Sequence, residues 1–94
     1  NNAGTYGIYA SSGSTVNALG ANCNNAGSIG IVASSGSTVN AHSTTIQNQT
    51  TGSARIFIDT GSYVVAQGIN TTGGTVPVFS QAVNTLTANG IIYQ

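Results

Sequence analysis

One internal repeat constrains this chain more than any other feature. Residues 1–18 read NNAGTYGIYASSGSTVNA and residues 24–41 read NNAGSIGIVASSGSTVNA, so fifteen of eighteen positions are identical at an offset of 23. A repeat of this length indicates that one structural unit stacks on a copy of itself, which places each residue type over its own image in the next layer. The sequence therefore predicts a solenoid.

A third, more divergent copy follows the first two. Residues 51–66 (TGSARIFIDTGSYVVA) align with residues 26–41 at an offset of 25, and the two extra residues fall between 43 and 50, where a loop tolerates insertion. A fourth copy is faint, because residues 74–78 resemble residues 52–56 at an offset of 22 before the pattern decays. We therefore expect two near-identical coils over residues 1–50, and a diverged coil with a capping tip over residues 51–94.

Composition and alternation favour strands over helices. Thirteen glycines among 94 residues, with many Asn, Ser, Thr and Val, disfavour helix. Apolar residues recur with a period of two at positions 29, 31 and 33 and again at 54, 56 and 58. Three short strands are predicted per coil, near residues 7–10, 14–18 and 19–23 in the first copy, with a corner at a repeated glycine. The expected fold class is all-β: a right-handed parallel β-helix of three to four coils of about 23 residues.

Stacked copies predict ladders of like side chains about 4.8 Å apart. The predicted core ladders are Ile8, Ile31 and Ile56; Val16, Val39 and Val64; Ala18, Ala41 and Ala66; and Ala10, Ala33 and Ile58. The third wall is predicted to hold Ala21, Thr44 and Ile69 beside Cys23, Ile46 and Thr71. The outward row is predicted to pair Gly30 with Arg55, Val32 with Phe57, Thr38 with Tyr63 and Asn40 with Val65. Stacked amides of Asn17 and Asn40 would bond along the axis.

The outward row of the third copy predicts association between chains. Its apolar side chains would otherwise face water, and so thin a core barely offsets an ordering entropy of roughly 1.5 kcal/mol per residue. Edges without Lys or Pro also favour association. The expected contacts begin at about residue 51 and are Phe57, Tyr63, Val65, Val78, Phe79, Ile91 and Ile92.

Charge and composition argue against several function classes. Only Arg55 and Asp59 are charged, which removes the basic footprint of a nucleic-acid binder. No apolar run approaches the roughly 20 residues of a membrane helix. One carboxylate is too few for glycoside hydrolysis, which normally uses two, and the lone Cys23 fits no metal-ligand spacing. We predict no catalytic residue, cofactor or metal site. Arg55 and Asp59 are expected to face outward, in ion pairs between layers or chains or with Asp59 accepting turn amides.

The segment GIYASSGSTVNALGANCNNAGSIGIVASSGSTVNA, residues 7–41, resembles the layered segments of bacteriophage tailspikes and related phage polysaccharide-binding or depolymerising proteins. The ending, from GSARIFIDTGSYVVAQGINTTGG to VNTLTANGIIYQ, is similar to the C-termini of such tail proteins. The resemblance covers essentially the whole chain. It implies a homotrimeric spike in the virion tail, assembled in the bacterial cytoplasm and extracellular after release, with an intertwined C-terminal trimerisation region. A complete member also has a large catalytic solenoid, so we expect this chain to be a fragment.

Two functions stay open at this point, with a third beside them. The first is a structural module that trimerises and stabilises a tailspike involved in host attachment. The second is a module that binds bacterial surface polysaccharide, with Tyr9, Tyr63 and Asn40 as candidate glycan contacts, because aromatic faces and amides suit sugar rings. The third is an ice-binding solenoid with regular Thr rows, although Tyr63 interrupts the row that Thr15 and Thr38 begin.

Overall fold

Short strands make up the regular structure of this chain. The computed structural model describes residues 6–24, 29–47, 49 and 52–94. No helix occurs in these ranges, and their strands are β1 (Tyr6–Ala10), β2 (Thr15–Asn17), β3 (Ile29–Ala33), β4 (Thr38–Asn40), β5 (Ile56–Ile58), β6 (Ser62–Val65) and β7 (Gly90–Tyr93). Residues 48 and 50 of the predicted insertion loop lie outside the description.

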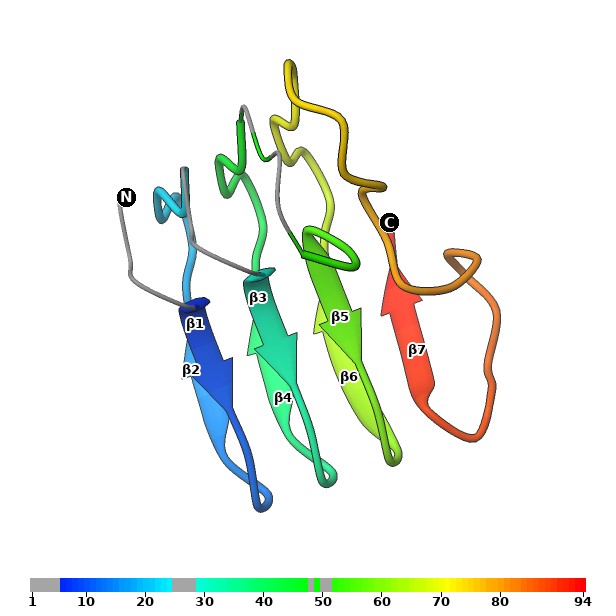
Figure 1. Ribbon diagram of the computed structural model, residues 1–94. Coiled ribbons are helices and arrows are strands. Elements are labelled where there is room, and N and C mark those ends of the chain that lie inside the picture. The colour runs from blue at the N-terminus through cyan, green and yellow to red at the C-terminus, as the bar shows by residue number, and fades with distance from the viewer. Residues whose placement is uncertain (1–5, 25–28, 48, 50–51) are drawn as a thin grey trace.

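The strands stack into two parallel sheets. Sheet A has the order β1-β3-β5, and sheet B has the order β2-β4-β6-β7. Each full coil contributes one strand to each sheet, so the chain winds as a β-solenoid of about three turns, with sheet A in front of β2, β4 and β6 in Figure 1. The predicted all-β parallel solenoid is confirmed.

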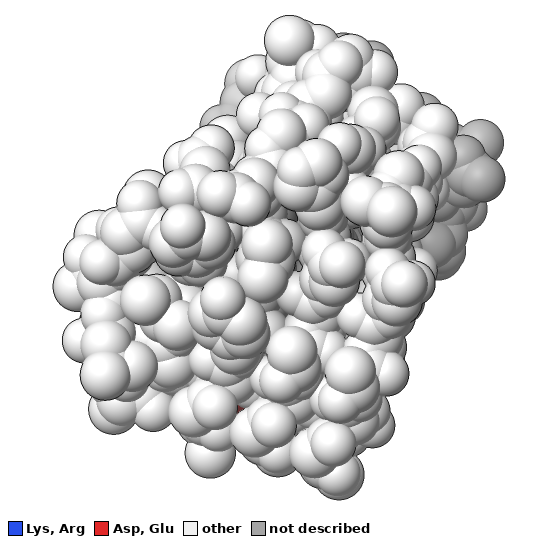
Figure 2. All heavy atoms as spheres, turned by 180° about the vertical axis from the view of Figure 1, so that it is seen from behind, with Lys and Arg blue, Asp and Glu red and all other residues white. Residues whose placement is uncertain are grey.

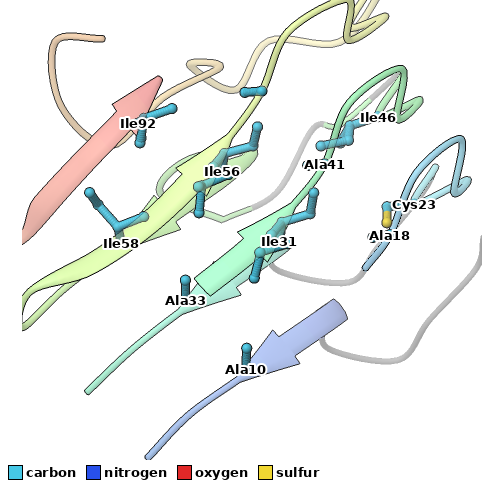
Figure 3. Packing of buried hydrophobic residues seen from close by; sticks show 13 residues of the cluster. Ala10, Ala18, Cys23, Ile31, Ala33, Ala41, Ile46, Ile56, Ile58 and Ile92 are labelled. Atoms are coloured by element: carbon cyan, nitrogen blue, oxygen red, sulfur yellow. The ribbon is translucent and has the colours of Figure 1, made fainter. Parts of the chain in front are cut away.

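The strand register places like residues over like. Ile31 lies between Ile8 and Ile56 in sheet A, and Val39 lies between Val16 and Val64 in sheet B. Inward side chains of both sheets, together with those of the connections, form one narrow core (Figure 3). Its fully buried members include Ile31, Ala33, Val39, Ala41, Ile46, Ile56, Val64, Ala66 and Ile92.

The corner between the two strands of a coil is a tight turn with two successive residues at positive φ. Ser12 and Gly13 have φ angles of 56° and 77°, and the same pair of angles recurs within a few degrees at Ser35–Gly36 and Thr60–Gly61. The turn closes where Ser14 N donates to Ser11 O at 3.2 Å. Two positive φ angles at the central positions are the mark of a type I′ turn, which glycine adopts without steric cost.

The third wall of each coil is a connection rather than a strand. Leu19 and Gly20 form a turn directly after β2, where Ala21 N donates to Ala18 O at 3.0 Å. Beyond it, the described residues of neighbouring layers pair through isolated bridges: Asn22 with Thr45, Thr45 with Asn70, and Gln49 with Gly74. The predicted strand at residues 19–23 is therefore wrong, because the turn leaves too few extended residues to form one. Cys23, Thr44 and Ile46 are nevertheless buried along this wall.

The C-terminal residues close the solenoid within the same chain. β7 pairs in parallel with β6 and places Ile92 opposite Val64, where its side chain is completely buried. Ile92, which was predicted as an intermolecular contact, thus ends the valine ladder of its own chain. In sheet A the faint fourth copy does stack, but Ile56 bridges to Phe79 rather than to Val78, one residue from the predicted register.

Candidate interaction surfaces

Apart from Ile92, which is buried in the core, the sequence-predicted contact residues are at least partly exposed to solvent, and they line no cavity. The described residues enclose no pocket, and within those ranges no three His, Cys, Asp or Glu side chains gather where they could share a metal ion. In the same part of the chain, no helix has the length and apolar character needed to span a membrane.

Two rows of outward side chains cross sheet B. The rows are Thr15, Thr38, Tyr63 and Ile91, and Asn17, Asn40, Val65 and Tyr93. They are polar over β2 and β4 and apolar over β6 and β7, where Tyr63 and Tyr93 are 38% and 43% exposed. We call Tyr63, Val65, Ile91 and Tyr93 the sheet B patch. Figure 2, which views the molecule from behind Figure 1, shows no basic side chain on this side and only a trace of acidic colour.

The predicted association contacts other than the buried Ile92 are divided among three places. Tyr63, Val65 and Ile91 come together in the sheet B patch. Phe57 belongs to the other sheet, where it stands next to Val32 in the register of β3 and β5. Val78 and Phe79 lie in the segment along the free edge of β5, and Phe79 packs partly against the core. The contacts proposed from sequence therefore do not form one surface.

The predicted glycan contacts also separate. Tyr9 lies on β1 of sheet A, 54% exposed, with its ring centroid 5.0 Å from that of Tyr6. Asn40 and Tyr63 lie on adjacent strands of sheet B, in neighbouring rows of the same face. Tyr93 lies in the same row as Asn40, beside Val65.

Axial amide bonds occur at a different position from the one predicted. The Oδ1 atoms of Asn17 and Asn40 accept bonds from backbone N–H groups two residues onward, as in an Asx turn. Gln47 instead joins the layers: its backbone N donates to Asn24 Oδ1 at 2.6 Å, and its Nε2 donates to Thr72 Oγ1 at 2.7 Å. Asn24 and Gln47 share one repeat position, which is the sequence signal that could have identified this ladder.

Arg55 points into the solenoid, in contrast to its predicted outward position. Its side chain is only 4% exposed. Nε donates to Val76 O and Nη1 donates to Ile46 O, each at 3.1 Å. Further bonds from the guanidinium reach the carbonyl oxygens of Thr71 and Gly73. The guanidinium charge is thus solvated by backbone carbonyl dipoles.

The equivalent position in the second coil explains why Arg55 faces inward. A Cβ added to Gly30 would lie 2.7 Å from Ile46 Cγ2, so this position faces the third wall instead of water. The alternation that predicted an outward side chain breaks here, since Arg55 and the adjacent Ile56 are both buried. Asp59 has a different partner from Arg55: its Oδ1 accepts a hydrogen bond from Ser34 Oγ at 2.7 Å, between two corners.

Two other reactive side chains have local roles. His42 Nδ1 lies 2.8 Å from Ser43 Oγ at an exposed turn. Cys23 is buried, and desolvation raises the pKa of its thiol, which keeps it protonated and unreactive near neutral pH.

The geometry therefore offers an apolar patch at one end of sheet B, a polar half beside it and a pair of tyrosines on sheet A. No protein-family model, curated protein or solved structure matches this chain.

Proposed function

We propose that this chain is a structural module that trimerises and stabilises the C-terminal part of a phage tailspike involved in host attachment. The observation that carries the proposal is the sheet B patch, in which four apolar or aromatic side chains lie in register on adjacent strands with no charge among them. Contiguous apolar surface of this kind commonly marks an interaction site. The resemblance of residues 7–41 to tailspike layers supplies the biological setting.

Further features belong to the same proposal. The coil is right-handed, because a crossover between parallel strands of one sheet is right-handed in nearly all known cases. The residues from about 51 onward form the association region, with the patch as its contact surface. The module resides in the virion tail and is extracellular after release.

Light scattering on the purified chain over a range of concentrations tests this function, and we expect the mass of three copies. The double variant Tyr63→Ser/Val65→Ser should weaken assembly by about 2 kcal/mol or more, a factor of roughly 30, because buried aromatic anchors carry most interface energy. The matched control Thr15→Ser/Asn17→Ser changes the same two rows on β2 and should leave the trimer intact. A monomer at every concentration, or an unaffected patch variant, would contradict the proposal.

Glycan binding is the second candidate function. The observation that favours it is the exposure of Tyr63 and Tyr93 on one face with Asn40, since aromatic faces stack on sugar rings and amides bond to hydroxyls. Binding on an array of bacterial polysaccharides that Tyr93→Ala abolishes, while light scattering shows unchanged assembly, would select this function.

A further inference from the structure

The sequence contains a single Asn-Gly pair, Asn89–Gly90, at the entry to β7. We propose that Asn89 is a site of spontaneous deamidation and that opening of the terminal coil controls its rate. An Asn followed by Gly is the most susceptible arrangement, because the missing side chain lets the glycine backbone nitrogen approach the Asn amide carbon.

The reaction needs only the chain and water. The backbone nitrogen of Gly90 loses its proton and bonds to Cγ of Asn89. The Cγ–Nδ2 bond breaks, and the departing NH2 group takes up one proton and leaves as ammonia. The resulting succinimide ring then takes up one water molecule at either carbonyl carbon. Ring opening yields aspartate, or isoaspartate in which the main chain runs through the former side chain.

Close packing against Ser62 requires a glycine at position 90, so the Asn-Gly pair is kept by the fold. Gly90 has a φ of 109°, and a Cβ added to it would lie 1.8 Å from Ser62 O. No other residue fits there while β7 stays paired with β6, so the fold requires this glycine. Asn89 itself is exposed to solvent.

In the native turn the nucleophile is already engaged in a hydrogen bond. Gly90 N, the nucleophile, donates to Thr87 O at 3.0 Å, and Asn89 O accepts from Ser62 N at 3.1 Å. Thr87 Oγ1 accepts from Asn89 N at 3.0 Å and donates to Gln81 Oε1 at 2.8 Å. The nucleophile must lose its hydrogen bond before it can attack, so reaction follows local opening of residues 87–90.

The products differ in their effect on the solenoid. Aspartate adds a second carboxylate to a chain that has one. Isoaspartate adds a backbone carbon between residues 89 and 90, which displaces Gly90 from Ser62 and Ile92 from Val64. We therefore expect isoaspartate-containing chains to lose the pairing of β7 with β6.

Incubation of the full chain in mildly alkaline buffer, followed by peptide mass spectrometry that separates aspartate from isoaspartate, tests the proposal. The reference is the same chain unfolded in guanidinium chloride. We expect Asn89 to deamidate at least about tenfold faster in the unfolded chain, since each 1.4 kcal/mol of opening free energy slows the native reaction by that factor. The isoaspartate fraction should also melt at a lower temperature than unmodified chain.

Two variants test whether local opening of residues 87–90 controls the deamidation rate. Thr87→Ala removes the side-chain bonds that hold the turn and should accelerate native deamidation several-fold. Thr85→Ala removes one local bond to Val83 O in the same loop and should leave the rate unchanged. Equal rates in native and unfolded chain, an unchanged rate in Thr87→Ala, or no product at Asn89 after unfolding would each overturn the proposal.

Discussion

At the scale of single residues, Arg55 differs most from the rest of the core. It occupies the column where the second coil has Gly30, and the carbonyl oxygens of Ile46 and Val76 that it binds are deep in the structure. A buried ionised group normally costs several kcal/mol unless it is paired. Here the partners are main-chain carbonyls, which no substitution can remove. The buried guanidinium and these carbonyl oxygens therefore each need the other as a hydrogen-bond partner.

Arg55→Met is therefore expected to destabilise the chain by about 3 kcal/mol, because it leaves at least two buried carbonyl groups without donors. Arg55→Lys keeps the charge but lacks the planar fork of donors, so an intermediate loss is expected. Urea unfolding followed by circular dichroism measures both. A methionine variant as stable as the parent would show that water reaches these carbonyl oxygens and replaces the guanidinium as their donor.

At the scale of the element, the turns after β2, β4 and β6 give a comparison within one molecule. Gly20 and Gly68 have φ angles of 70° and 68°, whereas the second coil places Ser43 in this conformation at 59°. A side chain in the left-handed region costs roughly 1–2 kcal/mol. The contact between Ser43 Oγ and His42 is exposed and offsets little of that cost.

Ser43→Gly is expected to stabilise the chain by roughly 0.5–1 kcal/mol, which is the relieved strain less the added backbone entropy of the unfolded state. Ala82→Gly is the matched control: residue 82 is exposed and its φ is not positive, so the same substitution type should destabilise there. Thermal unfolding of the two variants should give shifts of opposite sign. A lower melting temperature for Ser43→Gly would contradict the strain assignment.

The elements also show which parts of the fold could be predicted from sequence. Ile31 and Ile56 were placed correctly because a repeat records which residues lie over each other. The third wall was not, since repetition does not reveal whether Leu19 and Gly20 continue a strand or turn. β7 was missed because Ile92 belongs to no repeat, and its pairing follows from closure of the core.

Some residues of the candidate interaction surface could likewise be predicted from the sequence, and others could not. Tyr63 and Val65 could be recognised from sequence because they replace polar residues of the earlier copies. Tyr93 could not be assigned to their face without the register of β7 on β6. Gln47 was overlooked because its repeat position carries Asn24, Gln47 and Thr72 in successive copies, so no single residue type repeats there.

At the scale of the whole molecule, the two ends of the solenoid differ. β7 and the segment along β5 cover one end, whereas β1 and β2 form the other end and have one neighbouring strand each in the described part of the chain (Figure 1). Ile8 and Val16 are accordingly only partly buried, while Ile31 and Val39 beneath them are completely buried. Stability therefore depends on the number of coil-to-coil contacts as well as on the quality of each coil.

Insertion of a second copy of residues 24–46 directly after Ile46 should consequently stabilise the chain. The inserted coil would stack on the one that it duplicates, so it adds a layer of fully buried residues and leaves both ends unchanged. At roughly 0.05–0.15 kcal/mol per residue, the gain is expected to be about 1–3 kcal/mol. Urea unfolding should show a higher midpoint together with a larger m-value, since more surface is exposed when the longer chain unfolds. Insertion of the same residues in scrambled order is the control, because it adds equal length without the register. An unchanged or lower midpoint for the ordered copy would mean that stacking of like over like does not hold this molecule together.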